Sequence, residues 1–193
     1  MKNSNIAWCD HTFNPWEGCT KVSDGCIHCY ANDRDKRFHG GSHWGPGAPR
    51  KLMSAAYWRQ PLKWNREVTL ARTQLTADGK DVETIFPARP RVFCASLADW
   101  LDEEIPVNVL ADLLALIWTT PNLDWLLLTK RPENWKSRIE AAQDWHFDYG
   151  DRNVAGRLSD WRKHGIAPAN VWIGTSVENQ KYADIRIPRL LAI

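Results

Sequence analysis

The 193-residue sequence has little of what marks several specialised classes of protein. No apolar run approaches the roughly 20 residues that a helix needs to span a bilayer, and the N-terminal stretch MKNSNIAWCDHTFNPW lacks the apolar segment of a signal peptide. The formal net charge is only +2, so charge does not indicate a nucleic-acid or membrane partner. No internal repeat, P-loop, dinucleotide fingerprint or Ser-His-Asp grouping is evident. We expect one cytoplasmic domain over 1–193 and no membrane partner.

Cysteine is scarce, yet three of the five cysteines are crowded into the stretch GCTKVSDGCIHCYA. Cys19, Cys26 and Cys29 follow the spacing C-x6-C-x2-C. In a reducing cytoplasm, clustered cysteines are more often metal ligands or catalytic groups than disulfides. Cys94, inside the apolar run RVFCASLA, is expected to be a buried core residue instead. The stretch therefore predicts a metal centre held by the three clustered cysteines.

Two kinds of metal centre fit three cysteines. A structural zinc site needs four ligands, and one of His11, His39 and His43 would have to complete it. An iron–sulfur cluster is held by closely spaced thiolates and tolerates an incomplete set of protein ligands. Three cysteines on a four-iron cluster leave one iron open, which is the arrangement used when a cluster cleaves S-adenosylmethionine to begin radical chemistry. The cysteine spacing alone does not decide between zinc and an iron–sulfur cluster.

Strand-like and helix-like segments alternate along the chain, which predicts an α/β fold with a parallel sheet. The expected strands lie within 7–15, 91–99, 124–130 and 170–179. The expected helices lie at 30–38, 107–120, 131–143, 154–164 and 182–193. Four β-α units in order form the first half of a barrel or of a doubly wound sheet, and we expect a partial (β/α) barrel. A surface insertion is expected at 39–86, between the first helix and the second strand, with a hairpin around the Asp78-Gly79 pair.

Polar side chains come directly after each expected strand, at the edge of the sheet where reactive groups gather in βα barrels. The cysteine stretch follows the first strand. The candidates that follow the other three strands are Ser96, Asp99, Lys130, Thr175, Ser176 and Glu178. We expect them to surround one mouth together with the cysteines.

Four stretches, NPWEGCTKVSDGCIHCYA, RVFCASLADW, LLLTKRPEN and VWIGTSVENQ, together resemble a phage- and prophage-borne family of unassigned function. The three-cysteine motif of that family is similar to the motif of radical S-adenosylmethionine enzymes. The resemblance implies half of a TIM barrel, a 4Fe-4S cluster on the cysteines, and S-adenosylmethionine beside the cluster, in the cytoplasm of a bacterial host. Family members continue beyond the fourth unit, so the chain is expected to be truncated, with an open sheet edge through which it can form oligomers.

The resemblance also implies roles for the residues at the mouth. Thr175, Ser176 and Glu178 would face the ribose hydroxyls of the cofactor. Lys130 or Arg131 would pair with the methionine carboxylate, and Ser96 and Asp99 would accept hydrogen bonds from the methionine amino group. The alternative is that Lys130 and Arg131 form ion pairs with Glu133 or Glu178 and only stabilise the rim.

The stretch 57–66 interleaves Trp58 and Trp64 with lysine and arginine, a pattern suited to stacking bases and holding phosphates. The alternative is that the tryptophans cover the side of the barrel while the cations face water. We therefore expect a radical enzyme whose candidate substrate is a nucleic acid or a nucleobase. The alternatives are a metal-stabilised nucleic-acid-binding protein and a scaffold for a partner protein, both of phage origin and without catalysis.

Overall fold

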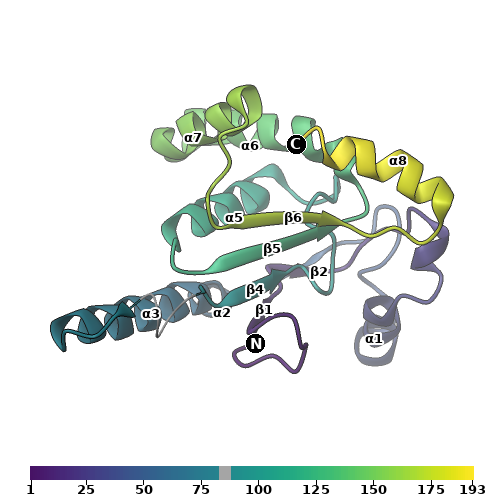
Figure 1. The fold of residues 1–193 in the computed structure, drawn as a ribbon. Helices are drawn as coiled ribbons and strands as arrows, with labels where there is room; N and C mark the ends of the chain where they lie inside the picture. The colour runs from purple at the N-terminus through teal and green to yellow at the C-terminus, as the bar shows by residue number, and fades with distance from the viewer. Residues whose placement is uncertain (83–87) are drawn as a thin grey trace.

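A computed structural model describes residues 1–82 and 88–193, and its centre is a four-stranded parallel sheet (Figure 1). The strands are β1 (His11–Phe13), β4 (Arg91–Cys94), β5 (Asp124–Thr129) and β6 (Val171–Thr175). They lie in the order β1-β4-β5-β6, and each neighbouring pair is parallel. The expected α/β fold with a parallel sheet is confirmed. Because the strands are parallel, all four carboxyl ends meet at one edge of the sheet.

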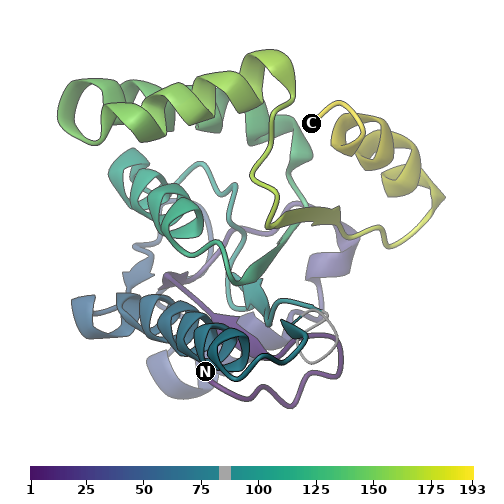
Figure 2. The ribbon, with the colours of Figure 1, turned by 60° about the vertical axis from the view of Figure 1, so that its left-hand side comes forward.

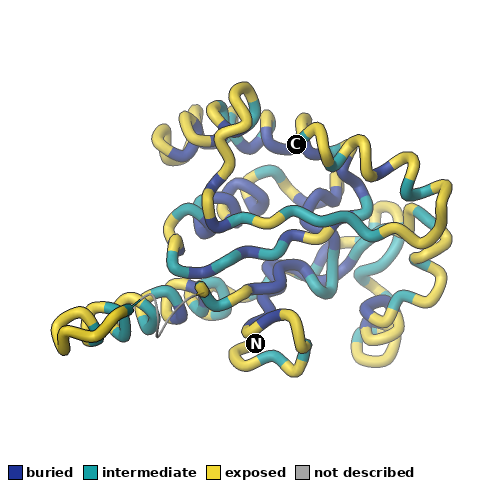
Figure 3. Tube along the Cα trace, viewed as in Figure 1, coloured by how far each residue is buried: buried dark blue, intermediate teal, exposed yellow. Residues whose placement is uncertain are grey.

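Helices from the later β-α units cover one face of this sheet (Figure 2). They are α5 (Val107–Thr119), α6 (Trp135–Tyr149) and α7 (Arg152–His164). Leu110, Leu114 and Ile117 recur at helical spacing on α5 and are fully buried. They share one apolar cluster with Trp125 and Leu127, whose side chains leave β5 on the same face. This cluster is the core, and its strands and helices stand out as the buried part of the chain (Figure 3).

The remaining elements surround the carboxyl edge and the β1 side of the sheet (Figure 1). Before β4 come the short antiparallel pair β2 (Trp16–Glu17) and β3 (Lys51–Leu52), the 3₁₀ turn η1 (Asp24–Cys26), α1 (Tyr30–His39), α2 (Ala55–Trp58) and α3 (Gln60–Ala77). After β5 come η2 (Pro132–Asn134) and, beyond β6, α8 (Gln180–Leu190). In the part of the chain that the structure describes, no helix is both long enough and apolar enough to cross a membrane.

The expected hairpin around Asp78-Gly79 is wrong for the residues that the structure describes. Helix α3 continues to Ala77, and Asp78 is its C-cap. Gly79 then takes a left-handed conformation with φ of 70°, which is the usual way in which glycine ends a helix. The Asp-Gly pair therefore stops a helix instead of turning between two strands. Residues 83–86 of the expected hairpin lie outside the described residues.

Both tryptophans of the stretch 57–66 pack against the core. Trp64 is buried, and its ring lies 4.4 Å from the His11 ring. Trp58 meets the ring of Phe13 edge-on at 5.6 Å. Arginine and lysine side chains of this stretch are exposed. The stretch thus has the arrangement in which tryptophans cover the fold and cations face water.

The second face of the sheet is only partly covered. Phe93, Leu126 and Trp172 are paired in register across β4, β5 and β6, so they share this face. Trp172 is 63% exposed, and Leu128, two residues along the same strand face, is 38% exposed. This face leads to the carboxyl edge, where the cysteines lie.

Candidate functional site

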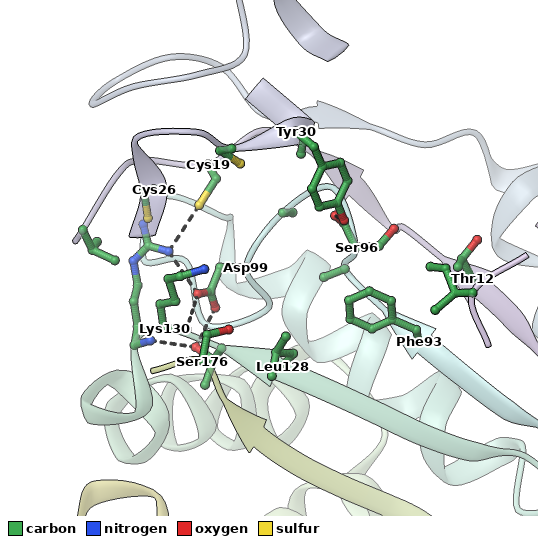
Figure 4. A pocket seen from close by; sticks show the side chains of 18 of the residues that line it. Thr12, Cys19, Cys26, Tyr30, Phe93, Ser96, Asp99, Leu128, Lys130 and Ser176 are labelled. Atoms are coloured by element: carbon green, nitrogen blue, oxygen red, sulfur yellow. Dashed lines mark hydrogen bonds and ion pairs between the residues drawn. The ribbon is translucent and has the colours of Figure 1, made fainter. Parts of the chain in front are cut away.

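A cavity of about 750 Å³ lies at the carboxyl edge of the sheet (Figure 4). Its volume falls in the range of about 300–1,000 Å³ that is usual for small-ligand sites. The cavity is lined by all three clustered cysteines, Cys19, Cys26 and Cys29. The candidate cofactor residues that line it are Ser96, Asp99, Lys130 and Ser176. Segments from four strand ends, far apart in sequence, therefore meet at one site.

Thr175 and Glu178 do not line the cavity. The Thr175 hydroxyl donates a hydrogen bond to the main-chain oxygen of Thr129 at 2.8 Å, which joins the ends of β5 and β6. Glu178 accepts hydrogen bonds from the Arg186 guanidinium at 2.8 Å and from the Ser23 hydroxyl at 3.0 Å. The side chain of Glu178 therefore links the cysteine loop to α8. Its position after a strand in the sequence did not predict this role.

The backbone of the cysteine loop is fixed at both ends. Gly18, which precedes the first cysteine, has φ of +114°, and a Cβ there would lie 2.3 Å from the main-chain oxygen of His43. Only glycine fits this conformation and this close approach. At the other end, Cys29 is the N-cap of α1, where the positive end of the helix dipole favours negative charge.

Asp99 is the hub that joins the ends of β4 and β5. One carboxylate oxygen accepts hydrogen bonds from the Thr129 hydroxyl at 2.7 Å and the Leu101 main-chain N–H at 3.0 Å. The other accepts from the Lys130 main-chain N–H at 2.8 Å and lies 3.3 Å from the Arg131 guanidinium. Both oxygens are engaged, so Asp99 acts here by positioning its neighbours.

Arg131 connects this hub to the first cysteine. Its guanidinium, which is almost fully buried, donates to Cys19 Sγ at 3.4 Å and to the main-chain oxygen of Thr20 at 2.6 Å. Hydrogen bonds to sulfur and nearby charge are among the features that set the potential of an iron–sulfur cluster. Arg131 can therefore stabilise negative charge on the Cys19 sulfur and on a metal centre bound to it.

A second polar pair joins the ends of β1 and β4. The Asn14 amide donates to the Ser96 hydroxyl at 3.0 Å, and Asn14 Oδ1 accepts from the Leu97 main-chain N–H at 2.8 Å. The Tyr30 hydroxyl donates to the Ser96 main-chain oxygen. Sequence reasoning missed Asn14, whose only signal is that it stands directly after a strand.

The expected insertion also contributes to the site. Arg50 is buried and donates to Asp102 at 2.8 Å and to the Thr20 hydroxyl at 2.8 Å. Glu104 accepts from the same Thr20 hydroxyl at 2.8 Å. The segment around Arg50 thus holds the start of the cysteine loop against the connection after β4. No local sequence pattern marks this role, because the partners of Arg50 are distant in sequence.

Two of the three thiols differ in how readily they ionise. Burial raises the pKa of Cys19 to about 11, although Arg131 acts in the opposite direction. Burial also acts to raise the pKa of Cys26, but backbone hydrogen bonds at Val22 and Ser23, the Ser23 hydroxyl and the charge of Lys130 together hold it below its usual value. Cys26 is therefore the more readily ionised of the two.

The cavity offers three thiols, the type of donor that iron–sulfur clusters take. Within residues 1–82 and 88–193, no three His, Cys, Asp or Glu side chains are placed to hold a single metal ion. Each thiolate of a four-iron cluster binds a different iron, so the three sulfurs need not converge on one point. The histidines considered for zinc, His11, His39 and His43, are not among the residues that line the cavity.

The fold and the cavity define an α/β protein with a cysteine-lined site at the carboxyl edge of a parallel sheet. The family model described as "Protein of unknown function (DUF5131)" matches residues 3–193, so the chain belongs to this family. No curated protein and no solved structure matches the chain. The chemistry of the site must therefore be inferred from its residues.

Proposed function

We propose that the protein is a radical S-adenosylmethionine enzyme that binds a 4Fe-4S cluster through Cys19, Cys26 and Cys29. The observation that carries this proposal is that all three thiols line one ligand-sized cavity at the carboxyl ends of four parallel strands. Reactive groups of βα barrels gather at this edge. The reducing cytoplasm of a bacterial host, the setting that the likeness to a phage-borne family implies, would keep the thiols free.

We also propose that the sheet is half of a (β/α) barrel of the radical-enzyme type. The strand order follows the chain order without reversal, and α5, α6 and α7 contribute to the buried core on one face. A doubly wound sheet has helices on both faces and a reversal of strand order. The partly exposed face would then be the inner face of the barrel, which agrees with the position of the cavity.

Different residues of the cavity would contact the cluster and the cofactor. When bound, a cluster of this kind supplies the single electron that cleaves S-adenosylmethionine reductively. Arg131 would stabilise negative charge at Cys19 through its hydrogen bond to the sulfur. Lys130 lies 3.9 Å from Glu178, a loose ion pair, so its ammonium can turn to the carboxylate of the methionine end. The Ser176 and Ser96 hydroxyls would supply hydrogen bonds to the polar groups of the cofactor.

Detection of 5′-deoxyadenosine tests this proposal. Protein reconstituted anaerobically with iron and sulfide would be incubated with S-adenosylmethionine and dithionite, and the products separated by chromatography. We expect 5′-deoxyadenosine from the unaltered protein and from Cys94→Ala, whose cysteine lies in the core, and none from Cys26→Ala. Reconstituted protein that holds iron yet forms no 5′-deoxyadenosine would contradict the radical mechanism.

A further inference from the structure

A smaller groove of about 180 Å³ continues from the cysteine cavity along the partly exposed face of the sheet. The two spaces share the side chains of Trp8, Phe93 and Leu128. Phe93 and Leu128 lie at the end of the cavity away from Cys19 and Cys26 (Figure 4). Every residue that lines the groove is apolar, whereas the cysteine end of the cavity carries the charged groups. The combined space thus has one polar end and one apolar end.

The floor of the groove is shaped by the register of β5 and β6. Leu126 is paired with Trp172, and Leu128 is paired with Gly174. A Cβ on Gly174 would lie 3.3 Å from Leu128 Cδ1, tighter than ordinary van der Waals contact. The Leu128 side chain therefore packs closely over Gly174, and Leu128 is one of the residues shared by the groove and the cavity.

Two exposed indoles line the groove. Trp8 is 47% exposed, and its ring lies 4.6 Å from the ring of Phe93. Trp172 is 63% exposed, and no other aromatic ring within the described residues packs against it. Exposed aromatic faces beside a ligand-sized cavity are suited to stacking on flat rings, because indole attracts aromatic partners beyond the area that they bury.

The charge at the polar end of the cavity restricts the chemical class of the ligand further. Lys21, Lys130 and Arg131 line it, with Asp99 as the carboxylate. Asp99 is already paired with Arg131, and Lys21 is exposed. The excess of positive charge favours an anionic group such as a phosphate.

We infer that the groove binds the base of a nucleotide, stacked on Trp172, with its phosphate toward Lys21 at the polar end, because Lys130 is taken by the methionine carboxylate in the proposed function. Base–aromatic stacking needs a π-face and no particular hydrogen-bond pattern, which matches a wall without polar groups. That this nucleotide is the substrate of the enzyme rests on the proposed function. The binding itself does not require the cluster.

Fluorine NMR of protein labelled with 5-fluorotryptophan tests the inference. The probes are thymidine and guanosine monophosphates, because S-adenosylmethionine carries adenine; ribose 5-phosphate lacks a base, and decanoate is a flexible aliphatic anion. Trp172→Phe assigns the Trp172 resonance by its disappearance. We expect the nucleotides to shift the Trp172 and Trp8 resonances and to leave that of Trp118 unchanged, since Trp118 packs on Trp161 of α7.

Three variants report on affinity in the same experiment, read from the Trp8 resonance where Trp172 is replaced. Trp172→Ala should weaken nucleotide binding about tenfold or more, while Trp172→Phe retains most of it. Gly174→Val should abolish binding because the new side chain would push Leu128 into the junction of the groove and the cavity, and its iron content after reconstitution should equal that of the unaltered protein. The measurements are made on both metal-free and reconstituted protein. If the protein binds the nucleotides but assembles no cluster on reconstitution, the assignment of the groove stands and its link to radical chemistry is refuted.

Three results would overturn the assignment of the groove. The Trp172 resonance could stay unmoved by either nucleotide in both forms of the protein. Decanoate could shift it as much as the nucleotides do, which would make the groove a site for aliphatic chains. Finally, the resonance could move with protein concentration alone, which would make this face a contact between two copies of the chain.

Discussion

Glu178 lies so close to Gly25 that a Cβ on the glycine would stand 2.0 Å from the Glu178 Cγ. The Glu178 carboxylate is held by Arg186 at 2.8 Å, by the Ser23 hydroxyl at 3.0 Å and, more loosely, by Lys130 at 3.9 Å. The connection between β6 and α8, which is distant in sequence, therefore contacts and supports the middle of the cysteine loop. The loop that carries the thiols is thus supported by a residue that is not among those lining the cysteine cavity.

Gly25→Ala is expected to disturb the cysteine loop. The new methyl group must displace a carboxylate that is held by an ion pair, and overpacking of this kind costs about 1–3 kcal/mol of the free energy of unfolding. In a Glu178→Ala background the same substitution should cost much less, because its obstacle is gone. Urea denaturation of the two single variants and the double variant measures the coupling. Gly156→Ala in α7 is the matched control, since nothing lies within 4 Å of its Cβ.

Additive losses in the double variant would show that Glu178 does not support the loop. Hydrogen exchange of the amides in 19–29 gives a second measurement, and we expect faster exchange in Gly25→Ala than in Gly156→Ala.

The thiols of the metal-free protein should react with iodoacetamide in a fixed order. The thiolate is the nucleophile, and a Cys19 pKa of about 11 leaves about one thiol in a thousand ionised at pH 8. The pKa of Cys26 is held below its ordinary value, so Cys26 should be labelled first and Cys19 only as the pH rises toward 11. Mass spectrometry of the labelled peptides measures both rates, with Cys94 as the buried control. Equal labelling of Cys19 and Cys26 at pH 8 would refute this difference.

The strands and the cysteine loop could be predicted because their signals are local. RVFCASLAD and DWLLLTK are apolar runs of strand length, and Pro106 precedes a helix whose leucines recur at helical spacing. The expectation that six residues gather at one mouth followed from the carboxyl ends of parallel strands. Ser96, Asp99, Lys130 and Ser176 line the cavity, whereas Thr175 and Glu178 do not.

The parts that sequence reasoning missed depend on contacts between distant residues. Arg50 and Asp102 form a buried ion pair, yet each alone has the sequence pattern of a surface residue. Glu178 is a polar residue that follows a strand, as a ligand-binding residue would, but its carboxylate accepts a hydrogen bond from Ser23 of the cysteine loop. The Asp78-Gly79 pair suits both a hairpin and a helix end, and the helix-forming residues before it decide for the helix.

Asp99→Asn is expected to destabilise the whole carboxyl edge of the sheet. An amide nitrogen would face donors from Thr129, Lys130 or Arg131, and Arg131 would lose its buried ionic partner. Breaking a buried pair in this way typically costs about 3–5 kcal/mol. Urea denaturation measures the loss, with Asp112→Asn on the exposed side of α5 as a near-neutral control. Equal stability of the two variants would mean that the Asp99 network does not hold β4 to β5.

Iron content after anaerobic reconstitution tests the central claim most directly. The unaltered protein and Cys94→Ala should each bind about four irons with matching sulfide, and Cys19→Ala, Cys26→Ala and Cys29→Ala should each lose the cluster, because two thiolates rarely retain it. The visible absorption of the cluster should disappear with the iron. Equal iron in Cys26→Ala and Cys94→Ala, or zinc bound in place of iron by the reconstituted protein, would contradict the assignment of the three cysteines to an iron–sulfur cluster.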